Sequence, residues 1–204
     1  MNKNLENIAL FDMDGTLCDF EGTLKSDLKK LAGPNEPEYP LHDEANTPEY
    51  IIERMRLIKK QPNWWFNLPV LNEGLTFYHL CKTVGFDIHI LTKGPKHTPN
   101  AWTEKLLWSQ KHLGMDIPVT ITFDKGLTYG KVLVDDWPEY IERWLKWRPR
   151  GLVIMPVREY NKDFKHPNVF QFNYYDFLDQ KKLDETKGLL QKVFERDSGE
   201  KIVF

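Results

Sequence analysis

Short apolar runs of strand length recur along the chain, and stretches with helical periodicity separate them. The strong runs are almost wholly apolar, which is typical of strands in a parallel sheet that is covered on both faces. We predict strands at Ile8–Asp12, Asp87–Thr92, Val119–Phe123, Lys131–Asp135 and Gly151–Pro156, with a weaker one at Asn168–Phe172. Because strands and helices alternate, the pattern predicts an α/β fold built on an open parallel sheet.

Three stretches have the apolar spacing or end signals of helices. Ala101–Leu113 has apolar residues near helical spacing and is followed by Gly114, a common helix-stop signal. Pro138–Trp147 begins with a proline, which the first turn of a helix tolerates. A third stretch, Leu189–Glu195, reads as a closing helix.

One segment interrupts the alternation. Between about residues 20 and 71 the chain shows no strand pattern, only helix-like pieces around a proline-rich stretch. The best of these is Thr47–Lys60, with Thr47 as the predicted N-cap and Pro48 next. The chain is therefore predicted to form a core from residues 1–19 and 72–204, with residues 20–71 inserted as a small helical cap.

Ionisable and hydroxyl side chains follow the ends of the predicted strands. They are Asp12 and Asp14 after the first strand, Thr92 and Lys93 after the second, Asp124 and Lys125 after the third, and Asp135 and Asp136 after the fourth. Ligands of open parallel sheets bind at this edge, where these side chains would converge. Converging carboxylates repel one another and need a counter-charge, and their hard oxygen atoms suit Mg²⁺.

Asp12 and Asp14 can share the work of hydrolysing a phosphate ester. We predict that one aspartate attacks phosphorus and that the other handles protons, because a metal ion and a lysine keep the first ionised. The phosphoryl oxygens then need donors, which Thr92, Lys125 and the backbone N–H groups after Asp12 would supply.

These elements resemble the four motifs of the haloacid dehalogenase (HAD) superfamily of phosphatases. The segment DMDGTL, the strand-terminal Thr92, then Lys125 and the Asp135–Asp136 pair occur in the same order as those motifs. The resemblance implies a HAD-like Rossmannoid three-layer sandwich with a central parallel sheet. It also places the insertion after the first strand where that superfamily has its first type of cap.

Further segments resemble the 5'(3')-deoxyribonucleotidase family within that superfamily, namely FDMDGTLCDFEGTL, WWFNLP, AWTEK, FDKG and LVDDWP. The resemblance implies that Asp12 is the nucleophile and Asp14 the general acid/base. It implies that the Asp12 carboxylate, the Asp14 carbonyl and a carboxylate of the acidic pair hold Mg²⁺, with Asp136 preferred over Asp135.

The same resemblance implies that Thr92 and Lys125 bind phosphate and that Phe20, Trp64 and Trp65 contact the base. Gly15, in the turn after Asp12, and Lys93, beside Thr92, are further phosphate-binding candidates. The three aromatic residues could equally be core residues, and Lys93 could be a solvent lysine.

The chain departs from the family at three positions. Lys93 replaces a second hydroxyl residue after Thr92, Phe123 replaces an arginine two residues before Lys125, and Trp137 replaces a common arginine after the acidic pair. These changes leave the phosphate chemistry intact and leave the preferred nucleotide open.

Composition narrows the classes of partner. The 28 basic and 30 acidic residues give a net charge of −2, which argues against a general nucleic-acid or membrane-surface binder. No apolar run approaches the roughly 20 residues of a membrane helix, and the first residues lack a signal-peptide pattern. Cys18 and Cys81 lack disulfide-framework or metal-site spacing, so a reducing cytoplasm is the expected location.

The sequence therefore predicts a Mg²⁺-dependent phosphatase that hydrolyses deoxyribo- or ribonucleoside monophosphates through an aspartyl-phosphate intermediate. The alternatives are a phosphatase or phosphomutase for another small phosphorylated metabolite, a polynucleotide-end phosphatase, and a non-catalytic binding relative. Homodimer formation and the choice between 5' and 3' phosphates stay open.

Overall fold

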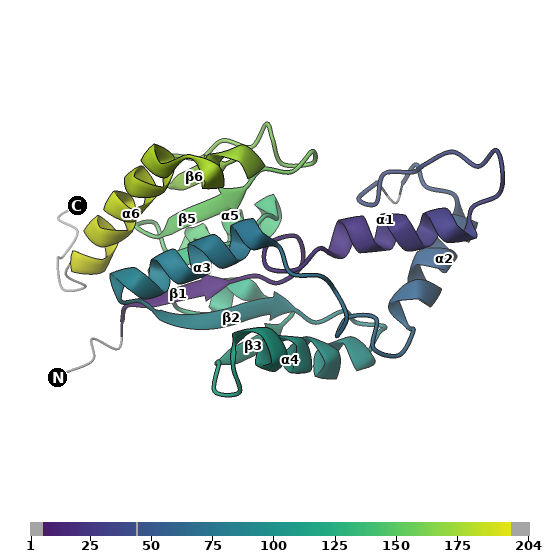
Figure 1. The fold of residues 1–204 in the computed structure, drawn as a ribbon, viewed down its shortest axis with the longest axis horizontal. Helices are drawn as coiled ribbons and strands as arrows, with labels where there is room; N and C mark the ends of the chain where they lie inside the picture. The colour runs from purple at the N-terminus through teal and green to yellow at the C-terminus, as the bar shows by residue number, and fades with distance from the viewer. Residues whose placement is uncertain (1–5, 44, 197–204) are drawn as a thin grey trace.

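The computed structural model describes residues 6–43 and 45–196, which fold around one six-stranded parallel sheet (Figure 1). The strand order is β3-β2-β1-β4-β5-β6, and every neighbouring pair is parallel. The strands are β1 (Ile8–Phe11), β2 (Asp87–Lys93), β3 (Val119–Thr122), β4 (Val132–Val134), β5 (Leu152–Pro156) and β6 (Val169–Phe172). All six predicted strands are confirmed, with small differences at their ends.

Helices cover both faces of the sheet, so the core has three layers. They are α3 (Asn72–Val84), α4 (Asn100–Leu113), α5 (Pro138–Trp147) and α6 (Gln180–Glu195). Trp108 of α4, Phe77 of α3 and Leu190 of α6 share one apolar cluster with Phe11 of β1, whereas α5 contributes to a second cluster. The predicted α/β fold with an open parallel sheet is therefore confirmed.

The alternation of side chains along the strands explains the two clusters. In β1, Leu10 packs in the cluster that contains Trp144 of α5, while its neighbours Ala9 and Phe11 belong to the cluster on the opposite face. Both faces of this strand are therefore apolar, and the polar groups of the segment are confined to the loop beyond Phe11.

Three helix assignments need correction. Thr47 does not cap α2 (Glu49–Lys59): Pro48 is the residue before the helix, no side chain caps it, and the Thr47 hydroxyl instead donates to the carbonyl of Asp43 at 2.7 Å in the preceding loop. The closing helix α6 is longer than the predicted Leu189–Glu195 and begins at Gln180, where the side chain of Asp179 accepts from the N–H of Lys181. The helix α3 was not predicted.

The segment between β1 and α3 extends past the carboxyl ends of the strands. It contains α1 (Phe20–Leu31) and α2, and Figure 1 shows both helices standing away from the sheet. Asp19 caps α1 by accepting from the N–H of Gly22 at 2.9 Å. This helical segment lies where the cap was predicted, and its boundaries at residues 19/20 and 71/72 stay a prediction.

Two residues of α4 tie the end of this segment to the core. The carboxylate of Glu104 accepts from the backbone N–H groups of Asn63 and Trp65, each at 3.0 Å. The indole N–H of Trp108 donates to the carbonyl of Leu68 at 2.8 Å. The chain between α2 and α3 is thus fixed by side chains of a helix that itself packs on the sheet.

None of the helices in the described ranges is both long and apolar enough to cross a lipid bilayer.

The Trp108→Ala variant tests the importance of this junction for stability. Trp108 is fully buried, so the substitution should leave a cavity and an unpaired Leu68 carbonyl and lower the unfolding free energy by about 3–5 kcal/mol. Urea denaturation measures this change. Trp147→Ala is the matched control, because that side chain is 61% exposed and should change stability little; similar losses in both variants would contradict the assignment.

Candidate active site

Lys125 joins two of the predicted carboxylates. Its side chain is buried, and Nζ lies 2.7 Å from Asp12 Oδ1 and 2.7 Å from Asp135 Oδ2. Burial alone would lower the pKa of Lys125, but the two carboxylates raise it above its usual range. Lys125 therefore stays charged and forms an ion pair with Asp12 just past the end of β1.

A second buried lysine, Lys105 of α4, binds the other predicted catalytic aspartate. Its Nζ donates to Asp14 Oδ2 at 2.6 Å, to Thr92 Oγ1 at 3.0 Å and to the carbonyl of Lys93 at 2.9 Å. Burial raises the pKa of Asp14, and the charge of Lys105 opposes that rise. Asp14 and Thr92 are thus positioned by one ammonium group, and the Thr92 hydroxyl keeps its own hydrogen for another acceptor.

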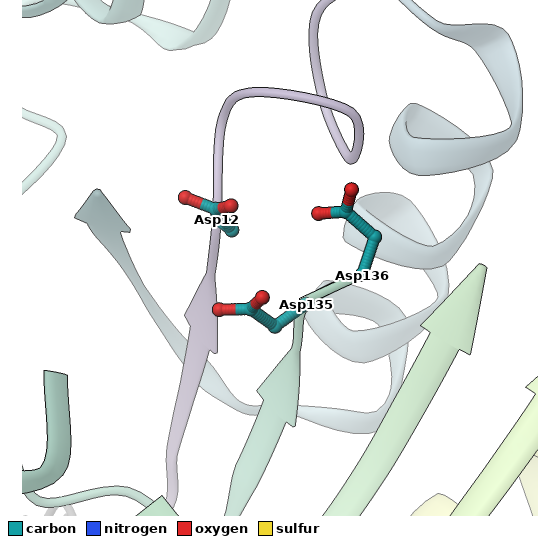
Figure 2. Close-up of side chains that lie close together, drawn as sticks. All are labelled: Asp12, Asp135 and Asp136. Carbon is teal, nitrogen blue, oxygen red and sulfur yellow. The ribbon is translucent and has the colours of Figure 1, made fainter. Parts of the chain in front are cut away.

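Three carboxylates converge from two neighbouring strands. Figure 2 shows Asp12 just past the end of β1, and Asp135 and Asp136 just past the end of β4. Each can offer a ligand atom within 4.8 Å of the others, and all three residues are buried. Burial, together with the negative charge of Asp12, raises the pKa values of Asp135 and Asp136.

The donor set fits a divalent metal ion. Asp12, Asp14, Asp135 and Asp136 bring four carboxylates, while the buried lysines Lys105 and Lys125 bring two positive charges. Two negative charges remain when all six groups are ionised. A divalent cation would neutralise them, and carboxylate oxygens are the ligands that hard divalent cations prefer.

The two members of the acidic pair have different environments. Asp135 is fully buried, and its oxygens accept from Lys125 Nζ and from the N–H of Trp137 at 2.9 Å. Asp136 instead lines the cavity described below and accepts from the hydroxyl groups of Thr16, at 3.1 Å, and Tyr160. This difference favours Asp136 as the metal ligand and Asp135 as the anchor of Lys125.

Gly15 shapes the loop after Asp12 without offering its N–H to a phosphate. Its φ is +76°, and a β-carbon would clash with the carboxylate of Asp136. Its N–H donates to the carbonyl of Cys18 at 3.0 Å. This N–H is therefore engaged within the loop, while Gly15 itself lines the cavity described below and its contact with phosphate stays a prediction. Gly15 allows the acidic loop to approach the acidic pair.

An arginine beyond β5 holds the same loop. Arg158 Nη2 donates to the carbonyl of Gly15 at 2.6 Å and to Glu73 Oε1 at 2.9 Å. Glu73 is buried in the first turn of α3, so the contact fixes Arg158 from two sides. The loop that carries Asp12 and Asp14 is thereby tied to a helix of the core.

A cavity of about 200 Å³ opens beside these groups. Its charged lining comes mainly from residues near the strand ends, namely Asp12, Asp14, Lys93, Lys125 and Asp136. The remaining lining is largely aromatic and comes from Phe20, Glu21, His42, Trp137, Tyr140 and Tyr160. Thr92 is fully buried behind this lining and contacts Lys105.

The predicted base-binding aromatics divide into two groups. Phe20 lines the cavity, but Trp64 and Trp65 are not among its lining residues. Both tryptophans pack against Phe20, with ring centroids 5.6 and 5.4 Å from it. Their indole N–H groups donate to Asp27 and to the Lys59 carbonyl. In this structure they support Phe20 rather than face a ligand.

Comparisons with known proteins show which proteins the sequence resembles. A Bordetella pertussis protein named "Putative 5'(3')-deoxyribonucleotidase" is 27% identical over 163 residues, covering 76% of this chain and 86% of that protein. The human mitochondrial 5'(3')-deoxyribonucleotidase is 28% identical over 145 residues, covering 64% of this chain and 62% of that protein. No family model matches the chain.

A solved structure shares the fold. It is a Burkholderia xenovorans protein titled a "putative haloacid dehalogenase-like hydrolase", with a TM-score of 0.53 over 94% of this chain and 99% of that one, at 16% identity. The chain is thus similar in sequence to 5'(3')-deoxyribonucleotidases, and it shares its fold with a HAD-like hydrolase. The predicted resemblance and the predicted fold class are confirmed.

Sequence reasoning missed several residues of this site. Lys105 had a usable signal, because it lies four residues after Ala101 and three before Trp108, on the buried face of α4. A lysine on such a face must find a charged partner. His42, Tyr160 and Arg158 had no such signal, since they come from irregular segments whose direction only the fold determines.

The acidic cluster predicts a stability that depends on metal and pH. Burial raises the pKa to about 8 for Asp135 and to about 6 for Asp136, so the folded state binds more protons than the unfolded state. In EDTA, the melting temperature should therefore fall as pH rises from about 5 to about 8. Mg²⁺ at pH 8 should raise the melting temperature again, because a concentration of 100 times its Kd adds about 2.7 kcal/mol to the free energy of unfolding.

Asp136→Asn should remove most of the Mg²⁺ effect, whereas Asp163→Asn, at an exposed position, should keep it. A melting temperature that ignores Mg²⁺ in the unmutated protein would contradict a metal site here.

Proposed function

We propose that the chain is a Mg²⁺-dependent phosphatase that hydrolyses deoxyribo- or ribonucleoside monophosphates through an aspartyl-phosphate on Asp12. The observation that carries the proposal is the pairing of two aspartates with two different buried lysines. Asp12 is bound to Lys125 and Asp14 to Lys105, so neighbouring carboxylates have separate environments. Such separation allows one group to act as nucleophile and the other as acid and base.

In the first step, a carboxylate oxygen of Asp12 attacks phosphorus, and the bond from phosphorus to the ester oxygen breaks. Asp14, whose pKa is raised by burial, gives its proton to the leaving alkoxide. The ammonium of Lys125 and the hydroxyl of Thr92 would stabilise the charge on the transferred phosphoryl oxygens. Magnesium held by Asp12, the Asp14 carbonyl and Asp136 would help to stabilise the negative charge on the phosphoryl oxygens.

In the second step, water attacks the phosphorus of the aspartyl-phosphate. Asp14 is now ionised and takes a proton from that water, while the bond between phosphorus and the Asp12 oxygen breaks. Inorganic phosphate leaves, and both aspartates return to their first states. Lys105 donates to Asp14 and would therefore influence both proton transfers.

The relatives support the substrate class. The named proteins are 5'(3')-deoxyribonucleotidases, and one of them aligns with 76% of this chain. The aromatic lining of the cavity suits a nucleoside leaving group. Magnesium is proposed as the metal because oxygen ligands and a phosphate substrate are its usual partners.

The same proposal includes a cytoplasmic location and a small-molecule partner. Cys18 and Cys81 are both buried free thiols, as expected in a reducing compartment. A net charge of −2 gives no reason to expect stable nucleic-acid binding.

Phosphate release tests the proposal directly. A panel of deoxy- and ribonucleoside 5'- and 3'-monophosphates and phosphosugars would be assayed with Mg²⁺ and with EDTA. We expect Mg²⁺-dependent turnover that is fastest on nucleotides, and Asp12→Asn should lower it by at least about a thousandfold because the nucleophile is lost.

The exposed variant Asp116→Asn is the matched control and should retain full activity. Ordinary turnover in Asp12→Asn would refute the mechanism, while turnover confined to phosphosugars would refute only the substrate class.

Lys105→Met tests the control of Asp14. The charge of Lys105 lowers the pKa of Asp14, so its removal should raise that pKa further. Protonated Asp14 is required in the first step, and the falling limb of kcat/KM against pH should therefore move to higher pH. Lys111→Met in the same helix should leave the limb in place, since Lys111 contacts Phe66 instead. A limb that stays fixed or moves to lower pH in Lys105→Met would contradict the role of Lys105.

A further inference from the structure

A cavity of about 260 Å³ lies at the opposite edge of the sheet from the acidic cluster. Its lining comes from residues just before β4, just before β5 and just after α6. The acidic cluster lies past the carboxyl ends of the strands, whereas this cavity lies at the amino ends of β4 and β5. We call it the basic cavity, and no step of the proposed reaction uses it.

The charged lining of the basic cavity is entirely cationic. Its four charged side chains are those of Lys131, Arg148, Arg150 and Arg196. None of the described residues that line it carries a carboxyl group. At the catalytic edge, in contrast, each of the two buried lysines binds a carboxylate of the same site. A lining of this kind favours a ligand with several negative charges.

Tyr129, which also lines the basic cavity, shows that the guanidinium groups converge. Burial is the main cause that raises the pKa of this phenol, and the negative charge of Glu6 adds to the rise. The positive charges of Arg196, Arg148 and Arg150 oppose it. Cations from two separate parts of the chain therefore lie close enough to act on one hydroxyl group.

Backbone carbonyls hold the cationic side chains in place. Lys131 Nζ donates to the carbonyl of Arg196 at 2.8 Å, and Arg196 Nη1 donates to the carbonyl of Arg150 at 2.7 Å. Arg148 Nη1 donates to the carbonyl of Gly126 at 2.7 Å. Arg148 Nε is buried and makes no hydrogen bond within the described ranges. The cations are thus positioned before an anion arrives, which lowers the cost of binding one.

The basic cavity is connected to the catalytic site through a short stretch of chain. This stretch begins at Lys125 and reaches the cavity lining at Tyr129 and Lys131. Arg148 links the two ends, since it lines the cavity and binds the carbonyl of Gly126, the residue after Lys125. An anion that attracts the guanidinium of Arg148 would compete with this carbonyl and shift the chain beside the catalytic lysine.

We propose that the basic cavity binds the phosphate chain of a triphosphate, and that the bound chain inhibits the enzyme through Arg148 and Lys125. A single phosphate, with a charge of about −2, could meet only part of this lining. The planar fork of an arginine binds phosphate oxygens in pairs, which suits a chain of phosphates. The binding stands apart from the proposed function, whereas the inhibition rests on it.

Calorimetric titration with inorganic tripolyphosphate in EDTA at pH 8 tests the binding. Without metal the catalytic site keeps its excess of negative charge and repels anions, so the titration reports the basic cavity. We expect one tripolyphosphate per chain and weaker binding at high salt. Arg148→Gln and Arg150→Gln should each weaken binding by about tenfold or more, because a charged hydrogen-bond donor is lost.

Arg56→Gln is the matched control for these variants. Arg56 lies on α2, where it pairs with Glu49 and Glu53, and its loss should leave the affinity unchanged. No binding to the unmutated protein would overturn the proposal. Affinities that are equal in all three variants would overturn it as well.

The deoxynucleotide dTTP distinguishes two sources of the phosphate chain. Trp147 lines the basic cavity with a ring that is 61% exposed, on which a base could stack. Tighter binding of dTTP than of tripolyphosphate, lost in Trp147→Ala, would assign the cavity to nucleoside triphosphates. Equal binding of the two would assign it to inorganic polyphosphate. Both results support a triphosphate site.

Inhibition is measured on dTMP at constant free Mg²⁺. We expect tripolyphosphate to lower kcat at saturating dTMP by about fivefold or more in the unmutated enzyme and in Arg56→Gln, but not in Arg150→Gln. Inhibition that saturating dTMP relieves would overturn the regulatory link, because it would show competition at the catalytic site. A protein that binds tripolyphosphate in EDTA but hydrolyses no nucleotide would refute the proposed function and support the basic cavity.

Discussion

The site depends on one buried ammonium group between two carboxylates. Lys125 contacts Asp12 at the end of β1 and Asp135 at the end of β4, and both of these strands lie at the centre of the sheet. Removing one partner from such a buried arrangement leaves an uncompensated charge, which costs more than the arrangement contributes when complete. The acidic pair, the nucleophilic loop and the metal-binding geometry are therefore energetically linked through Lys125.

Parallel strand order creates this meeting point. β1 and β4 are neighbours in the sheet although they are distant in sequence, so their carboxyl ends bring Asp12 beside Asp135 and Asp136. Lys125 follows β3, at the sheet edge, in a short 3-10 helix that turns its side chain inward. On the other side of Asp14, Lys105 comes from α4 between β2 and β3. Two lysines from separate elements thus balance carboxylates that adjacent strands force together.

The sequence predicted the parts of this site that follow from periodicity and strand ends. Asp12 follows β1 directly, and Asp136 and Lys125 lie within three residues of the ends of β4 and β3, so the rules of parallel sheets place all three at one edge. Lys105 was predictable in principle from its buried helical position. The irregular segments were not: the loop between α1 and α2 brings His42 to Trp137, and no local pattern encodes that contact.

Thr47, Trp64 and Trp65 show why residue type alone does not predict the partner of a side chain. Thr47 has the right residue type for an N-cap, but the helix begins one residue later, after Pro48, and the Thr47 hydroxyl donates to the Asp43 carbonyl in the loop. The sequence left Trp64 and Trp65 open between base stacking and the core; in the structure both are buried, and their indole N–H groups donate to Asp27 and to the Lys59 carbonyl. In each case the residue type limited the roles that the side chain could have, and the folded structure determined which group it binds.

Rapid acid quenching with 32P-labelled dTMP tests the central claim most directly, because it detects the covalent intermediate itself. The account predicts acid-stable label on the protein within the first turnover, released by hydroxylamine and carried on the peptide that contains Asp12. Turnover of dTMP without any labelled protein, or with label on a different peptide, would contradict it.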